Sequence, residues 1–226
     1  MKLQAVCFDY GGTLDGPASH WLPRFHQLYR EAGLVLPLEQ FRAAFDHATQ
    51  YGYADPSVAS MDLPALVAFH VARQLEYLEV RNATLVARVA DVFVANSRAA
   101  LAHSRTVLDR LRHRVALGVI SNFYGNVARI LDDAGIGAWL SVVIDSNRVG
   151  VSKPDPAIFA LAVHRLGCAP EEVLYVGDSF EKDVVAARAA GLRSAWLVGG
   201  AEQTCRAPEL VDVRLRDLAD VEAIIE

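Results

Sequence analysis

Four stretches of the sequence place side chains that could bind a metal ion or an anion directly after an apolar run. In chain order these side chains are Asp9, the pair Ser121-Asn122, Lys153, and Asp178 with Asp183. Carboxylates can act as nucleophiles or hold a hard cation, while hydroxyl, amide and ammonium groups can bind an anion. A single polar residue at such a position is often only a turn or helix-capping residue. Four clusters in this arrangement indicate one shared site.

The apolar runs are predicted to be buried strands of a parallel sheet, because they are short and rich in strand-forming residues. The runs span 3–8, 115–120, 142–144, 173–176 and 194–198. Helix-like segments that each end near a glycine span 126–134, 156–166 and 182–190. This alternation predicts βαβ units and a doubly wound, Rossmann-like α/β fold, with a closing helix at 217–225. Ligands of such sheets bind outside the carboxyl ends of the strands, where the four clusters fall.

Residues 16–103 have a different pattern, with apolar residues at three- and four-residue spacing and no strand-like run. This spacing predicts an all-helical block inserted after the first strand, with breaks between helices at Pro37 and at 54–57. The expected domains are therefore an α/β core formed by 1–15 and 104–226 and a helical insertion at 16–103. The aromatic residues of the insertion, including Phe45 and Tyr53, are predicted to pack in its core.

Composition excludes several classes of protein. The net charge of −5 argues against a nucleic-acid partner, which would require a basic surface. No apolar stretch approaches the roughly 20 residues needed to span a membrane, and the N-terminus is too quickly polar for a signal peptide. The three cysteines have no metal-ligand spacing. These features predict a soluble, cytoplasmic protein that does not bind membranes, and they leave its oligomeric state open.

The four clusters match known motifs in order and in strand context. The stretches are F-D-Y-G-G-T-L-D, V-I-S-N, G-V-S-K-P-D and V-G-D-S-F-E-K-D, and together they extend from Asp9 to Asp183. In these motifs the chain resembles the haloacid dehalogenase-like hydrolase superfamily, in the type that carries a helical cap. The resemblance implies that the inserted helical block closes over the substrate.

For the family's phosphatases, the resemblance implies that Asp9 is the nucleophile and forms an aspartyl-phosphate that water then hydrolyses. It also implies a Mg²⁺ cofactor held by Asp9, the backbone carbonyl of Gly11 and Asp178. Asp183 is a further candidate that could ligate the metal, bind its waters or orient a lysine.

The remaining motif residues are expected to hold the substrate, a small phosphorylated metabolite. The resemblance implies that Ser121 and Lys153 bind phosphate oxygens and offset negative charge in the transition state, so both are candidate catalytic residues. Thr13 and Asn122 are further candidate substrate ligands. His20 and Trp21 are the best candidates for contact with the rest of the substrate, because the chain enters the insertion there.

One position departs from the pattern of the family's phosphatases. They usually carry an aspartate two residues after the nucleophile, which protonates the leaving group, and this sequence has Gly11 there. Either the substrate has a leaving group that needs little protonation, or another residue supplies the acid. Asp15, Tyr10 and a residue of the cap are the candidates. Strand alternation makes Tyr10 a weak one, and Asp15 could equally cap a turn.

Other functions are compatible with a glycine at this position. A 2-haloacid dehalogenase needs no such acid, and Arg24 or Arg42 could serve as its halide-binding arginine, but the family's dehalogenases lack the motif that carries Asp178 and Asp183. A phosphonate hydrolase would need a cap lysine, and 16–103 contains none. A catalytically weakened binding or regulatory protein of the same fold is the remaining alternative.

Overall fold

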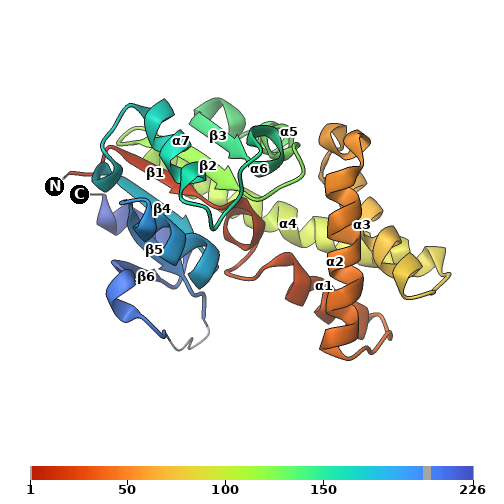
Figure 1. The fold of residues 1–226 in the computed structure, drawn as a ribbon. Coiled ribbons are helices and arrows are strands. Elements are labelled where there is room, and N and C mark those ends of the chain that lie inside the picture. Colours follow the sequence, from red (N-terminus) through yellow and green to blue (C-terminus); the bar gives the residue numbers. More distant parts are fainter. Residues whose placement is uncertain (1, 201–204, 226) are drawn as a thin grey trace.

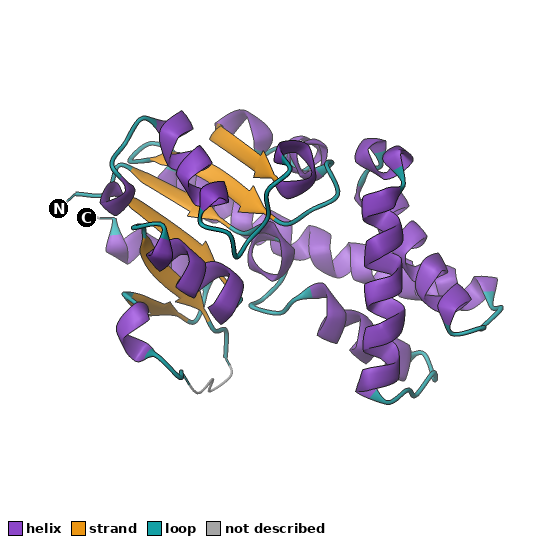
Figure 2. Cartoon of the chain, viewed as in Figure 1, coloured by secondary structure: helices purple, strands orange, loops and turns teal. Residues whose placement is uncertain are grey.

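The computed structural model describes residues 2–200 and 205–225. Its strands lie together in one part of the molecule, and the other part contains only helices and their connections (Figure 2). The strands are β1 (Ala5–Phe8), β2 (Ala116–Ser121), β3 (Leu140–Asp145), β4 (Val173–Gly177), β5 (Arg193–Leu197) and β6 (Val213–Leu215). They form one parallel sheet in the order β3-β2-β1-β4-β5-β6, which confirms the predicted α/β fold.

Helices cover both faces of this sheet, so its central strands are buried on both sides. Because side chains alternate along a strand, Val6 and Phe8 of β1 enter one hydrophobic core and Ala5 and Cys7 the other. The first core contains residues of α4 (Ala83–Leu111) and α5 (Val127–Asp133). The second contains residues of α7 (Ala157–Leu166) and α8 (Ala186–Ala189). The continuous apolar run of β1 is thereby explained.

The carboxyl ends of the central strands meet at one edge of the sheet. Phe8, the last residue of β1, lies beside Val119 of β2 and Val176 of β4. The strand order reverses at β1, because the chain adds β2 and β3 on one side of it and β4 to β6 on the other. This is the topological switch point at which open α/β sheets bind ligands.

The sheet departs from the predicted one at its edge and near the C-terminus. The sixth strand, β6, was not predicted; it has three residues and pairs with β5. The predicted closing helix is confirmed, as a 3-10 helix at Leu218–Ile224. The segment 182–190 is helical, but it begins as an irregular turn at Phe180–Val185 before α8.

The inserted block consists of α1 (Trp21–Glu31), α2 (Leu38–Ala54), a 3-10 turn (Pro56–Ser60), α3 (Leu63–Tyr77) and the first part of α4. The breaks predicted at Pro37 and 54–57 lie at the two ends of α2. Figure 1 shows α4 extending from this helical part to the sheet. The proposed division at residue 103 therefore falls inside one continuous helix, and the domain boundary stays a prediction. No described helix is both long and apolar enough to cross a membrane.

Candidate active site

The turn after β1, Tyr10–Leu14, brings the first motif against the fourth. Gly12 has a φ of 97°, and a Cβ at this position would lie 2.6 Å from Oδ2 of Asp178. Only glycine fits both the backbone conformation and the close approach. The neighbouring Thr13 donates a hydrogen bond from Oγ1 to Oδ1 of Asp178, at 3.2 Å. Thr13 therefore contacts a candidate metal ligand, and its predicted contact with substrate stays a prediction.

Asp15 anchors this turn and does not line a cleft. Its side chain is completely buried, and Oδ1 accepts the backbone N–H of Gly12 at 2.7 Å. Oδ2 accepts the indole N–H of Trp21 at 2.6 Å, and Arg24 forms an ion pair with Oδ1 at 3.2 Å. Ser97 of α4 also donates to Oδ2, at 3.4 Å. These contacts fit a turn-anchoring residue and leave Asp15 poorly suited to supply the missing acid.

Two other residues considered from the sequence are also held in the interior. Arg24 pairs with Asp15, donates to Ser97 at 2.6 Å and lies over the ring of Phe93 at 4.2 Å. These contacts hold the guanidinium inside the protein, away from the cleft. Tyr10 is buried, and its ring meets that of Phe123 edge to face at 5.0 Å.

Lys153 lies at the centre of the strand-end cluster. Its buried Nζ donates to Oδ1 of Asp9 at 2.8 Å, to Oδ1 of Asp183 at 2.6 Å and to the hydroxyl of Tyr175 at 2.9 Å. Burial on its own lowers the pKa of Lys153, but the carboxylates of Asp183 and Asp9 outweigh it and raise the pKa overall. The ammonium therefore stays protonated beside the candidate nucleophile.

Asp9 has one oxygen fixed and the other free of hydrogen bonds. Ser121 and Lys153 both donate to Oδ1, at 2.9 and 2.8 Å. Among the described residues none donates to Oδ2. This arrangement orients the carboxylate and leaves Oδ2 available to a metal ion or an electrophile.

Asp9, Asp178 and Asp183 offer carboxylate oxygens that lie within 4.8 Å of one another. The pKa of Asp178 is raised well above its usual range, first by burial and then by the charges of Asp9 and Asp183. Three hard oxygen donors with one ammonium as counter-charge fit a divalent cation such as Mg²⁺. Asp183 fits least as a direct ligand, because Lys153 and the backbone N–H of Ser179 occupy its two oxygens at 2.6 and 2.8 Å.

Asn122 and Tyr175 hold Lys153 in place. The Asn122 side chain donates to the backbone carbonyl of Lys153 and accepts its backbone N–H, both at 2.8 Å. The Tyr175 hydroxyl accepts from Lys153 and donates to the carbonyl of Ile120 at 2.7 Å. The predicted role of Asn122 was substrate binding, whereas these contacts position a loop. Tyr175 was missed; a hydroxyl inside a buried strand, which must find a partner, was the available signal.

A cleft of about 570 Å³ opens from this cluster toward the cap. Gly11, Asn122, Asp178 and residues of the cap helices line it. Its aromatic lining residues are His20, Trp21, Phe45, Tyr53, Phe123 and Tyr124. Phe45 belongs to the cap core as predicted, and it also lines the cleft. The same prediction is wrong for Tyr53, which is exposed and lines the cleft from outside that core.

A buried hydrogen-bond chain connects the cap to the loop after β2. Tyr29 donates to Gln74 at 2.9 Å, Gln74 contacts Nδ1 of His70 at 2.7 Å, and Nε2 of His70 lies 3.1 Å from the hydroxyl of Tyr124. Burial lowers the pKa of His70 to about 3, so the ring is neutral. These hydrogen bonds satisfy both nitrogens of the buried His70 ring and hold Tyr124, which lines the cleft.

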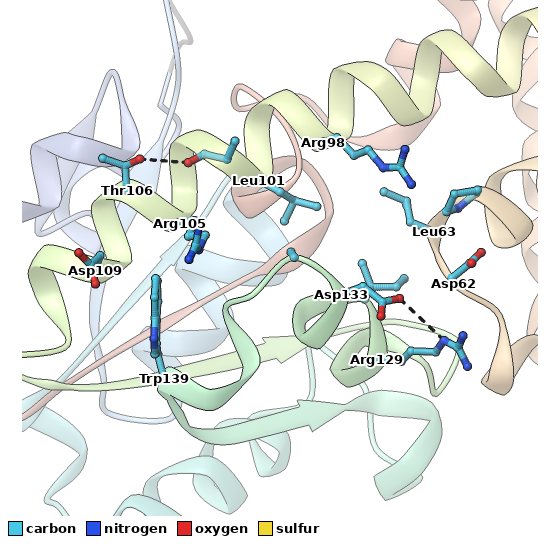
Figure 3. Close-up of a pocket in the computed structure, with 14 residues that line it drawn as sticks. Asp62, Leu63, Arg98, Leu101, Arg105, Thr106, Asp109, Arg129, Asp133 and Trp139 are labelled. Carbon is cyan, nitrogen blue, oxygen red and sulfur yellow. Dashed lines mark hydrogen bonds and ion pairs between the residues drawn. The ribbon is translucent and has the colours of Figure 1, made fainter.

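A second hollow, of about 700 Å³, lies between α4, α5 and Trp139. Figure 3 shows Arg98, Arg105 and Arg129 around it, with Arg129 paired to Asp133. None of the strand-end carboxylates lines it. Its charged lining residues are Asp62, Asp109, Asp133 and the three arginines, and they lie apart from the motif residues.

The model of one protein family matches residues 3–191, and its description is haloacid dehalogenase-like hydrolase. The chain belongs to this family. The match covers all four motifs, from Asp9 to Asp183. The strand-end cluster at the switch point of the sheet therefore lies entirely within the matched stretch.

Curated relatives of this hydrolase include named phosphatases. A phosphoserine phosphatase of Thermus thermophilus is 39% identical over 112 residues, which is 49% of this chain and 44% of the relative. Phosphoglycolate phosphatase 1 of Pseudomonas aeruginosa is 38% identical over 115 residues, 47% of this chain and 41% of the relative. The matched stretch spans less than half the length of either relative.

Solved structures share the fold over the whole chain. A phosphatase of the same superfamily from Thermococcus onnurineus has a TM-score of 0.58 at 21% identity, covering 99% of this chain and 98% of that one. A 2-haloacid dehalogenase from Pseudomonas syringae has a TM-score of 0.56 at 20% identity, with the same coverage. Because both chemistries occur on this fold, the choice between them depends on the site residues.

The clustered carboxylates predict that the metal-free hydrolase loses stability as pH rises. The pKa values of Asp178 and Asp183 are raised in the folded state, so between the ordinary aspartate value of 3.8 and the raised values the folded state binds more protons than the unfolded state. Their contribution is present at low pH and is lost as pH rises through this window. We expect Asp178→Asn to raise the melting temperature of EDTA-treated protein at pH 7.5 by about 3 °C, and to change it less at pH 4.5.

Thermal unfolding followed by circular dichroism tests this prediction. Added Mg²⁺ should stabilise the wild type at pH 7.5 more than it stabilises Asp178→Asn, since the variant lacks a ligand. Asp155→Asn, on an exposed loop, is the control for loss of a carboxylate. A metal-free Asp178→Asn protein that is less stable than the wild type at pH 7.5 would contradict the explanation.

Proposed function

We propose that this protein is a phosphomonoester phosphatase with Asp9 as its nucleophile. The observation that carries the proposal is the state of the Asp9 carboxylate. Ser121 and Lys153 hold Oδ1, while Oδ2 has no hydrogen bond and lies in a cluster with Asp178. A nucleophilic carboxylate must be held in a fixed orientation and keep a free lone pair on the oxygen that attacks. Positive charge nearby is also needed, so that an anionic substrate can approach.

The reaction would proceed in two displacements at phosphorus. In the first, Oδ2 of Asp9 bonds to phosphorus as the ester P–O bond breaks and the alcohol oxygen leaves with the bonding electrons. In the second, water attacks the same phosphorus and restores the carboxylate, releasing inorganic phosphate. Lys153 and Ser121 would bind phosphate oxygens at both steps. Thr13 stays a proposed substrate ligand, and Asn122 would act through the Lys153 loop that it holds.

A Mg²⁺ ion fits the cluster, with Asp9, Asp178 and the Gly11 carbonyl as its proposed protein ligands. When bound, it would supply positive charge between the carboxylates and the anionic substrate. Asp183 would then act mainly on Lys153, because both of its oxygens are already occupied. This role is one of the three predicted for Asp183.

The alternatives have less support from the site. Of the two candidate halide-binding residues, Arg24 is paired with Asp15, whereas Arg42 lines the cleft. The carboxylate cluster around Lys153 is suited to a cation, which favours the phosphatase. The curated relatives described above are named as phosphatases, which supports a phosphate ester as the substrate. The clustering of Asp9, Lys153 and Asp178 also favours an active hydrolase over a regulatory fold-mate, although Gly11 departs from the phosphatase pattern. The substrate is proposed to be a small phosphorylated molecule, and the cytoplasm stays the proposed location.

Hydrolysis of p-nitrophenyl phosphate tests the proposal. We expect turnover in the presence of millimolar Mg²⁺ and its loss in EDTA, with recovery when Mg²⁺ is restored. Release of fluoride or chloride from a 2-haloacid without metal is the parallel assay for a dehalogenase. Halide release with no phosphatase turnover would overturn the proposed function.

A further inference from the structure

The position of the missing acid faces the cleft and has room for a side chain. Gly11 lines the cleft, and a Cβ built on it would meet only the ring of Trp21, at 4.0 Å. Steric crowding therefore does not explain the glycine, in contrast to Gly12, whose Cβ would collide with Asp178. The space beside Gly11 is open, and residue 11 places no proton donor in it.

Asp15, Tyr10 and His20 are poorly placed to replace the missing acid. Asp15 is buried and accepts hydrogen bonds on both oxygens, and Tyr10 is buried and absent from the cleft lining. His20 lines the cleft, but its Nδ1 accepts the backbone N–H of Leu22 at 3.4 Å. Burial lowers the pKa of His20, so the ring is neutral and offers Nε2–H as a hydrogen-bond donor. His20 can therefore donate a hydrogen bond to a leaving oxygen while its ring stays neutral.

Six of the sixteen residues that line the cleft carry aromatic rings, and the charged side chains of the lining are Arg42, Asp46, Asp178 and Lys182. Rings from the cap, including Phe45 and Tyr53, face rings from the loop after β2, Phe123 and Tyr124. The centroids of Tyr53 and Tyr124 lie 4.9 Å apart, with the ring planes inclined at 46°. Such rings favour a flat apolar group through stacking and edge contacts.

We propose that the substrates of this hydrolase are aryl phosphates, the phosphate esters of phenols. The proposal rests on the proposed phosphatase function and joins two independent observations: no acid at residue 11 and aromatic walls beyond it. A phenol has a pKa of about 10, like a tyrosine side chain, so its anion leaves without prior protonation. An aliphatic alkoxide is far more basic and needs the proton that an aspartate at position 11 would give.

Tyr53 offers a clean test of the aromatic wall. Its side chain is 42% exposed, so its removal should leave the cap folded. Tyr51 is a matched control on the same helix, because it is 48% exposed and packs beside His47 instead of lining the cleft.

The experiment compares kcat/KM for phenyl phosphate, acetyl phosphate and glycerol 3-phosphate in the wild type, Tyr53→Ala and Tyr51→Ala, all with Mg²⁺. Acetyl phosphate has a good leaving group but no ring. We expect phenyl phosphate to exceed glycerol 3-phosphate by at least about 100-fold. Tyr53→Ala should lower kcat/KM for phenyl phosphate by about 3- to 10-fold and for acetyl phosphate by less than twofold, while Tyr51→Ala changes neither.

A second variant, Gly11→Asp, tests the missing acid. It should raise kcat/KM for glycerol 3-phosphate by at least about 10-fold and change that for phenyl phosphate much less. Wild-type hydrolysis of glycerol 3-phosphate as fast as phenyl phosphate, or equal losses on phenyl and acetyl phosphate in Tyr53→Ala, would overturn the aryl phosphate proposal alone. Failure to hydrolyse any of the three phosphate compounds would instead overturn the phosphatase function and this proposal with it.

Discussion

Replacement of Asp9 by asparagine should lower kcat for p-nitrophenyl phosphate by a factor on the order of 10⁴ or more, as expected when a covalent nucleophile is removed. The carboxamide can still accept the hydrogen bonds that Ser121 and Lys153 direct to Oδ1. It places an uncharged NH₂ group where Oδ2 lies, and this group cannot attack phosphorus. The variant should fold normally, because the substitution removes one of three clustered negative charges.

The matched control for Asp9→Asn is Asp145→Asn. Asp145 ends β3 at the same edge of the sheet and is also buried, but its oxygens accept backbone N–H groups of Gly125, Val127 and Asn147. It lies outside the carboxylate cluster, so folded Asp145→Asn should keep turnover within a few-fold of the wild type. Melting temperatures establish that each variant is folded.

A direct measurement accompanies this kinetic test. Acid quenching of the wild type during turnover, followed by peptide mass spectrometry, should find a phosphoryl adduct on the peptide that contains Asp9. Asp9→Asn should show none. An adduct on a different residue, or near-normal turnover by Asp9→Asn, would show that Asp9 is not the nucleophile.

Replacement of Lys153 by methionine should damage both activity and stability. Methionine matches the length of the stem but removes the ammonium that contacts Asp9, Asp183 and Tyr175. Loss of this charge should lower kcat/KM by about 10²- to 10³-fold. Leaving Asp183 buried without its partner should lower the free energy of unfolding by about 3–5 kcal/mol, which corresponds to a melting temperature about 10 °C lower.

Lys182→Met is the control for stability, because Lys182 is exposed and forms no ion pair among the described residues. We expect it to change the free energy of unfolding by less than about 0.5 kcal/mol. Urea unfolding gives the stability difference, and the kinetic comparison is made at a temperature where both variants are folded. If Lys153→Met kept the wild-type kcat/KM, phosphate binding by the ammonium would be ruled out.

The sequence by itself determined the layout of the sheet and which motifs meet at its edge. Apolar runs such as 3–8 and 173–176 can be buried on both faces only in a covered parallel sheet, and parallel strands bring their carboxyl ends together. Asp9, Lys153 and Asp178 could therefore be assigned to one site although they are far apart in the chain. β6 escaped prediction because a three-residue edge strand pairs through its backbone and leaves little side-chain pattern.

Only the tertiary structure decided how individual side chains are used. From the sequence, Asp15 could be either a catalytic acid or a turn residue. In the structure it binds the indole of Trp21 and the guanidinium of Arg24, as a residue that anchors the turn does. Tyr51 and Tyr53 look alike in the sequence, yet only Tyr53 lines the cleft. The physical reason is that strand and helix periodicity fixes which face a residue occupies. The side chain that it contacts on that face comes from a distant part of the chain, so the local sequence pattern cannot predict it.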